Sequence, residues 1–273
     1  MNGFLPLLTL ALILAYGVLS RHVLLHWRDE SASTRNLRRE YLMLGGLLLL
    51  HALAVLAPFA QGAEVSVGVG RVLALVVWLM LLIYWTCSFF YRLEGLQLFM
   101  MPLAMLSLAF ALFFPGDHIL RDPGSPALLL HILVSVLAYS LLTIAVLIAL
   151  LMMALERALH DKRASTLVRR LPPLLSLEKM MFQVIAVGFS LLSVSLISGS
   201  IFSEELFGKP AMLTHKTVFG AMSWLLFGLL LLGRRLRGWR GRVAIRWTLA
   251  GFAALLLAYI GSKIVLELIL HRA

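Results

Sequence analysis

The chain has 273 residues, of which 61% are hydrophobic and only 14% charged, and its mean hydropathy is +0.95. Soluble domains carry about 25% charged residues, so this composition excludes an ordinary soluble protein. The formal charge of +11 would suit nucleic acid, but the basic residues gather in short segments between apolar runs. There they act as topology signals, and we expect a lipid bilayer and no nucleic acid as partner. The single cysteine, Cys87, excludes an internal disulfide and a cysteine-based metal site.

Apolar runs long enough to cross a ~30 Å hydrocarbon core as helices recur along the chain. The first run has no basic segment before it, which favours an uncleaved span over a removable signal peptide. In chain order, the predicted spans cover residues 3–20, 41–59, 69–91, 95–114, 127–153, 180–202, 213–233 and 246–270. Because the connections are short, we predict an all-α, polytopic membrane bundle of about eight transmembrane helices that forms one domain, residues 1–273.

Lysine and arginine gather on one side of the predicted membrane. The connections after the first, third, fifth and seventh spans hold 18 of the 24 basic residues, namely Arg21, Arg28, Arg35, Arg38, Arg39, Arg92, Arg157, Lys162, Arg163, Arg169, Arg170, Lys179, Arg234, Arg235, Arg237, Arg240, Arg242 and Arg246. Cytoplasmic segments are enriched in these residues, so this side is predicted to face the cytoplasm and both termini the outside. We expect a multi-pass protein of the bacterial inner membrane.

Three of the eight histidines lie within a predicted span or at its edge. His51 lies about ten residues into the second span, which at 1.5 Å per residue places it near the middle of the bilayer. His131 lies about one turn inside the outer end of the fifth span, and His215 lies at the outer end of the seventh. An imidazole in hydrocarbon is costly without a partner. Each histidine is therefore either hydrogen-bonded within the bundle or part of a functional site.

Two imidazoles on facing helices at one depth can ligate a haem iron from both sides, with apolar side chains around the porphyrin. His131 and His215 are the candidate pair for haem b, and His51 is a deeper or alternative ligand. Lys216 and Arg71 are candidate contacts of the haem propionates. The same histidines would also suit a proton relay, or simple hydrogen bonding inside the bundle.

No catalytic residue is predicted, because the sequence has no P-loop, nucleophile elbow, Rossmann fingerprint or pair of carboxylates within a span. Glu204 and Glu205 are expected to be a solvated loop pair. Lys263 and Glu267 are four residues apart in the last span and are predicted to pair with each other.

Three stretches resemble the cytochrome c assembly family, the membrane haem-handling proteins that include Ccs-type synthetase subunits. "LLLHILVSVLAYSLLTIAVLIALLM" is similar to the family helix that opens with a histidine and carries a small–Tyr–small element eight residues later. "LEKMMFQVIAVGFSLLSVSLISGSIF" resembles the helix with a Gly–Phe centre and a closing glycine before the outer loop. "HKTVFGAMSWLLFGLLLLGRR" resembles the helix that follows the family's tryptophan-rich loop.

The loop before this last helix differs from that of the haem-exporting members. They carry a "WGxxWxWD" motif, whereas residues 201–216 here read "IFSEELFGKPAMLTHK" and contain no tryptophan. This shorter form resembles the YpjD-like or HemX-like branch. The resemblance implies a haem-binding bundle that faces outward, with His131 at the position of the family's outer-face histidine ligand. It also implies a role in cytochrome c-type biogenesis or haem supply, through a membrane protein partner.

Two other functions stay open. A small transporter or accessory subunit would use intramembrane histidine, His51 above all, for proton or ion movement without haem. A purely structural partner subunit would hold no cofactor. The haem content of the purified protein discriminates between these functions and the first.

Overall fold

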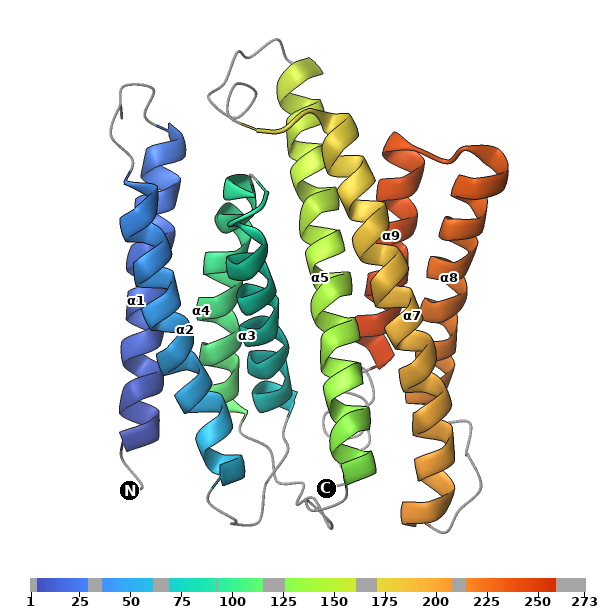
Figure 1. Ribbon diagram of the computed structural model, residues 1–273, viewed down its shortest axis with the longest axis horizontal. Helices are drawn as coiled ribbons and strands as arrows, with labels where there is room; N and C mark the ends of the chain where they lie inside the picture. The colour runs from blue at the N-terminus through green and yellow to red at the C-terminus, as the bar shows by residue number, and fades with distance from the viewer. Residues whose placement is uncertain are drawn as a thin grey trace. The chain divides into compact units, whose positions relative to one another are not determined.

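The computed structural model describes residues 4–28, 36–60, 69–91, 93–114, 126–160, 171–207 and 215–258 (Figure 1). All regular secondary structure in these ranges is helical, which confirms the predicted all-α membrane fold. Among the described residues, seven helices are long and apolar enough to cross a membrane. The eighth predicted span, residues 246–270, begins within α9 (Gly241–Leu256) and continues outside the described residues.

The chain divides into two compact units. Unit 1 consists of residues 1–123 and 154–173, and unit 2 consists of residues 124–153 and 174–273. The helix α5 (Pro126–His160) therefore contributes most of its length to unit 2 and its last residues to unit 1. The single domain expected over residues 1–273 stays a prediction.

In its described part, unit 1 contains α1 (Phe4–Arg28), α2 (Leu37–Ala60), α3 (Val69–Cys87) and α4 (Gln97–Phe113), with a short 3₁₀ helix, η1 (Glu94–Leu96), before α4. The helix α1 packs against α2 and α4, and α3 packs against the same two helices. Two indole N–H groups tie α3 to α2. Trp78 donates to the Leu48 carbonyl at 3.0 Å, and Trp85 donates to the Tyr41 carbonyl at 3.0 Å. These bonds fix the register of the two helices.

The helices α3 and α4 approach each other closely at Gly70. A Cβ atom at this position would lie 2.6 Å from the Cα of Ala111 and 2.6 Å from the carbonyl oxygen of Phe114. Both are backbone atoms, which cannot move aside unless the helix itself moves. Gly46 on α2 is the opposite case, because no atom lies within 4 Å of a Cβ built there.

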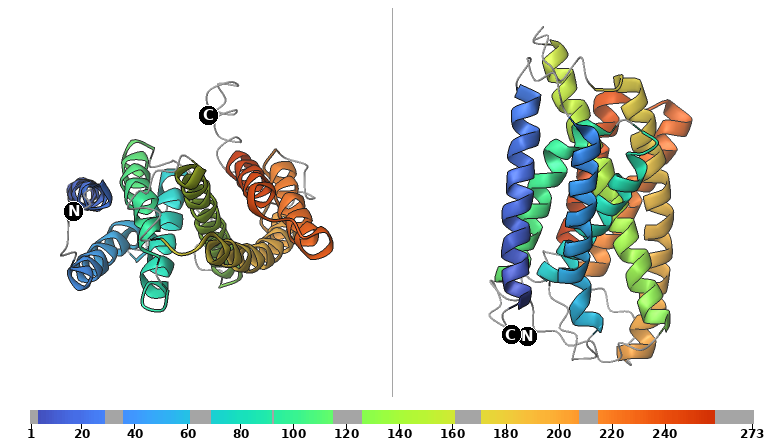
Figure 2. Two further views of the ribbon diagram at one scale, coloured as in Figure 1. Left: turned by 90° about the horizontal axis from the view of Figure 1, so that it is seen from above. Right: turned by 60° about the vertical axis from the view of Figure 1, so that its left-hand side comes forward.

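Unit 2 contains residues 126–153 of α5 together with α7 (Leu174–Phe207), α8 (His215–Arg237) and α9. These helices alternate in direction, and α7 lies between α5 and α8 (Figures 1 and 2). The starts of α5 and α8 and the end of α7 therefore meet at one end of the unit, which we call the histidine end. The opposite end, where α8 passes into α9, is called the basic end. The predicted orientation places the histidine end outside and the basic end in the cytoplasm.

Several helices run past the boundaries of the predicted spans. The helix α1 reaches Arg28, α5 reaches His160 and α8 reaches Arg237. Many basic residues expected in loops therefore stand on last helical turns, where positive charge interacts favourably with the helix dipole. Hydrocarbon thickness sets the length of an apolar run but not the end of a helix, which continues through the headgroup region. For the same reason Glu204 and Glu205, expected in a loop, belong to the last turn of α7.

One buried carboxylate joins α7 to the turn between α8 and α9 at the basic end. Glu178 accepts hydrogen bonds from Arg234 Nη1 at 3.1 Å, from Arg240 Nε at 3.0 Å and from the backbone N–H of Gly241 at 2.9 Å. The Arg234 guanidinium also lies 3.7 Å from the ring centroid of Phe182. A buried carboxylate is costly unless its charge and lone pairs are satisfied, and here two cations and an N–H satisfy them. Arg234 and Arg240, predicted from the sequence only as topology signals, thus join the turn between α8 and α9 to α7.

Replacing Gly70 with alanine is expected to destabilise the protein by about 1–3 kcal/mol, because the new methyl group meets backbone rather than movable side chains. The thermal unfolding midpoint of purified Gly70→Ala in detergent should fall below that of the wild type. The matched variant Gly46→Ala adds the same methyl group in open space and should keep or raise the midpoint. Equal midpoints for the two variants would contradict the close approach of α3 and α4.

Candidate functional site

The candidate ligand His131 stands in the second turn of α5, at the histidine end of unit 2. Its ring is half-buried, and its Nδ1 lies 2.7 Å from the Oγ of Ser198 on α7. The single hydroxyl hydrogen of Ser198 is directed to the Val194 carbonyl, 2.8 Å away. We therefore infer that Nδ1–H of His131 donates to Ser198, which leaves the lone pair of the neutral imidazole on Nε2.

The other edge of the His131 ring lies against Gly199. A Cβ atom on this glycine would lie 3.2 Å from Cε1 and 3.8 Å from Nε2 of the ring. A larger residue at position 199 would therefore press on the Cε1 edge of the ring. Ser198 thus holds one nitrogen of the ring, and Gly199 lets α7 pass close to its Cε1 edge. Metal-ligating histidines are held in the same way, by a partner on the nitrogen that does not bind metal.

Serine hydroxyls continue this polar contact along α5 and α7. Ser135 Oγ donates to the His131 carbonyl at 2.7 Å and lies 2.6 Å from Ser195 Oγ. Further along α7, Ser193 accepts the indole N–H of Trp224 on α8 at 2.8 Å. The serines of α7 thus bond to α5 through Ser195 and to α8 through Ser193.

The two other candidates of unit 2 are the first two residues of α8. His215 is its first residue and Lys216 its second, and both are exposed. Because α5 and α8 both start at the histidine end, these residues share that end with His131. Of the predicted set, the structure thus places His131, His215 and Lys216 at one end of unit 2, on the starts of two helices.

His51 belongs to unit 1 and is fully buried in α2. Its Nδ1 lies 3.2 Å from the hydroxyl of Tyr16 on α1, and the two rings meet edge to face with centroids 5.7 Å apart. Its Nε2 has no hydrogen-bond partner among the described residues. The sequence did not predict Tyr16 as the partner, although a tyrosine within the first apolar run was an available signal.

The remaining candidates also lie in unit 1 or outside the described residues. Arg71 is the third residue of α3 and is half-buried. Lys263 and Glu267, predicted to pair, lie outside the described residues. Within the described ranges, no group of three or more His, Cys, Asp and Glu side chains is able to hold a metal ion.

Comparisons with known proteins agree with this fold. The sequence model of the family described as cytochrome C assembly protein matches residues 66–270. The inner membrane protein YpjD of Escherichia coli K12 is 35% identical over 166 residues, which are 61% of this chain and 62% of YpjD. The cytochrome c biogenesis protein CcsA of Chlamydomonas reinhardtii is 25% identical over 199 residues, which cover 67% of this chain and 55% of CcsA. The chain thus spans less than two thirds of the length of either relative.

The matched range runs from just before α3 to beyond α9, so it includes His131, His215, Lys216 and Arg71, whereas His51 precedes it. The match to YpjD, an inner membrane protein, confirms the predicted location and the YpjD-like character of the sequence. The family predicted from residues 127–235 is confirmed over a range that covers most of the chain. This chain belongs to the cytochrome c assembly protein family.

Proposed function

We propose that this protein binds haem b at the histidine end of unit 2 and handles that haem for cytochrome c assembly. Membership of the family supports a role in this process at the inner membrane. The observation that carries the haem proposal is the placement of His131. Its Nδ1 is held by Ser198 and its ring lies on Gly199, an arrangement in which Nε2 is the nitrogen that would ligate the iron.

The residues at this end suit the iron, the propionates and the apolar porphyrin of haem. His131 and His215 supply two imidazoles, the donor type of six-coordinate haem proteins. Lys216 supplies a cation of the kind that pairs with a propionate. Exposed apolar side chains on α5 next to His131, such as Leu130 and Leu133, provide apolar surface of the kind a porphyrin requires. Haem bound there would supply a redox-active iron, or would itself be the cargo of assembly.

The protein groups around His131 have distinct tasks in this proposal. Ser198 fixes the tautomer and the orientation of the ring, and its oxygen makes Nε2 more basic by accepting Nδ1–H. Ser135 restrains the backbone of His131 through its carbonyl. Lys216, the second residue of α8, is the cation that would pair with a haem propionate at this end. All of these groups belong to unit 2.

A second candidate function is favoured by His51. A buried imidazole with one nitrogen on Tyr16 and the other without a partner among the described residues is able to ligate a deeper haem. The same pair is able to pass a proton within unit 1, which is the basis of the transporter or accessory-subunit alternative. Haem content distinguishes these alternatives, because the second requires none.

Absorption spectra of the purified full chain, oxidised and reduced, together with pyridine-haemochrome quantification test the proposal. Wild-type protein from haem-replete cells is expected to show a Soret band and a sharp reduced α band. His131→Ala and His215→Ala should lose the sharp reduced α band, or the haem itself, because each removes an axial ligand. The control His160→Ala alters an exposed histidine in the last turn of α5 and should keep both bands.

Two outcomes of these spectra would contradict the proposal. Loss of the bands in His51→Ala alone would assign the haem to unit 1. Absence of haem from the wild type, even after reconstitution, would favour the transporter or accessory-subunit function.

Replacing Ser198 with alanine is expected to weaken haem affinity about 10–100-fold, because partners on the second nitrogen of a ligating histidine contribute that much. Haem titration of the apoprotein, followed at the Soret band, measures this change. The matched control is Ser200→Ala, since the exposed Ser200 hydroxyl donates to the Ile197 carbonyl of its own helix. Equal affinities of the two variants would contradict the orienting role of Ser198.

A further inference from the structure

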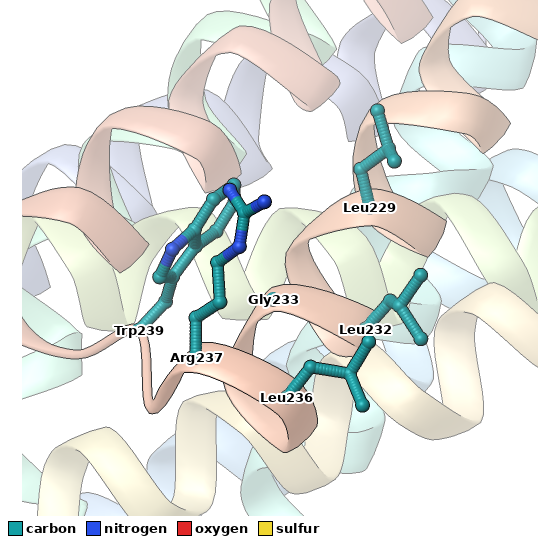
Figure 3. A pocket seen from close by; sticks show the side chains of 6 residues that line it. All are labelled: Leu229, Leu232, Gly233, Leu236, Arg237 and Trp239. Carbon is teal, nitrogen blue, oxygen red and sulfur yellow. The ribbon is translucent and has the colours of Figure 1, made fainter.

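A cavity of about 180 Å³ lies at the basic end of unit 2, away from the candidate haem site (Figure 3). It is lined by Leu229, Leu232, Gly233, Leu236, Arg237 and Trp239. The three leucines are exposed to 40%, 50% and 72% of their surfaces, so the cavity has an open, apolar side. In the predicted orientation, this side faces the lipids of the cytoplasmic leaflet.

The cavity wall is built by the turn that ends α8. Gly238 adopts a left-handed conformation with φ of 65°. The N–H of Gly238 donates to the Arg234 carbonyl at 3.2 Å, and the N–H of Trp239 donates to the Gly233 carbonyl at 3.3 Å. The bond from Gly238 to Arg234 and the left-handed Gly238 are typical of an αL C-cap, which ends the helix and turns the chain back onto it. The turn brings Trp239 against α8.

Gly233 allows the indole to pack there, because any Cβ at this position would collide with the ring of Trp239. The indole also packs against Trp247, with ring centroids 4.9 Å apart. The cavity wall is therefore fixed by two glycines and a pair of tryptophans. A membrane-facing helix that needed only apolar contact with lipid would require none of these features.

Arg237 supplies the charge at the cavity, and its side chain runs beside the indole of Trp239 (Figure 3). The neighbouring Arg234 and Arg240 are both engaged by the single carboxylate of Glu178, which leaves one positive charge of that cluster uncompensated. Arg237 itself has no hydrogen bond or ion pair to the residues that the structure describes. The cavity thus combines an apolar interior with an available guanidinium group at its edge.

We propose that this cavity binds an anionic phospholipid of the cytoplasmic leaflet. The upper part of an acyl chain lies against the leucines and the indole, and the phosphate bonds to Arg237. Charge complementarity carries the assignment, since a guanidinium group pairs with a phosphate through two parallel hydrogen bonds. Basic pockets between cytoplasmic helix ends select anionic headgroups, and tryptophan is enriched at headgroup depth. A zwitterionic lipid fills the same apolar space, but its own ammonium offsets the attraction to this basic end.

Fluorescence quenching by brominated lipids tests the proposal on the purified full chain. The chain is placed in phosphatidylcholine nanodiscs that contain equal fractions of either brominated phosphatidylglycerol or brominated phosphatidylcholine. The difference in quenching between the wild type and Trp239→Phe is assigned to Trp239. Brominated phosphatidylglycerol is expected to quench the fluorescence of Trp239 more strongly than brominated phosphatidylcholine does. In the Arg237→Gln variant, the ratio of quenching by brominated phosphatidylglycerol to quenching by brominated phosphatidylcholine should fall about fivefold. This is the effect of one basic residue at an anionic surface.

A matched control separates a site from the general charge of this end. Arg235→Gln removes an exposed arginine from the same turn of α8 that does not line the cavity, and it should keep the preference. Leu232→Phe keeps every charge but narrows the cavity, and it should reduce quenching by the anionic lipid. Equal quenching by the two lipids, or equal losses in the two arginine variants, would overturn the proposal. Unchanged quenching in Leu232→Phe would overturn it as well.

Discussion

A polar group inside a bilayer has no water to bond, and the polar contacts of this protein are shaped by that constraint. Glu178 is satisfied by two guanidinium groups and a backbone N–H, and His131 by a serine. Most described serine hydroxyls within the helices bond to a carbonyl of their own helix. Apolar contact alone does not drive membrane helices together, so the few bonds between helices, those of Glu178 and His131 among them, decide which helix faces meet and in which register.

The helix α7 links the two ends of unit 2. Glu178 stands near its start and Ser198 lies twenty residues further, roughly 30 Å away at 1.5 Å per residue, which equals the hydrocarbon thickness. The arginines that bind Glu178 fix the height of α7 at the basic end. The bond between Ser198 and His131 fixes its height at the histidine end. A continuous helix that is anchored at both ends holds the imidazole in one place, and a ligand for a rigid macrocycle requires such placement.

The sequence predicted the helical membrane fold and the positions of the spans, because hydrocarbon thickness imposes the length of each apolar run. It did not predict how far α1, α5 and α8 extend, since basic residues at headgroup depth continue a helix as readily as they end it. The need of His51 for a partner was predictable from its depth, but the choice of Tyr16 depends on how α1 packs against α2. Glu178 lies next to Lys179 at the edge of a span, so only the fold distinguishes it from a solvated residue. The cavity at Trp239 depends on the φ of Gly238, which the apolar pattern does not encode.

Ligation of one haem iron by His131 and His215 is best tested by electron paramagnetic resonance of the ferric protein, because the spin state of the iron reports its axial ligands. We expect a low-spin signal in the wild type. In both His131→Ala and His215→Ala, a high-spin signal should replace it, or the haem should be lost. A low-spin signal that persists unchanged in His131→Ala would contradict this ligation.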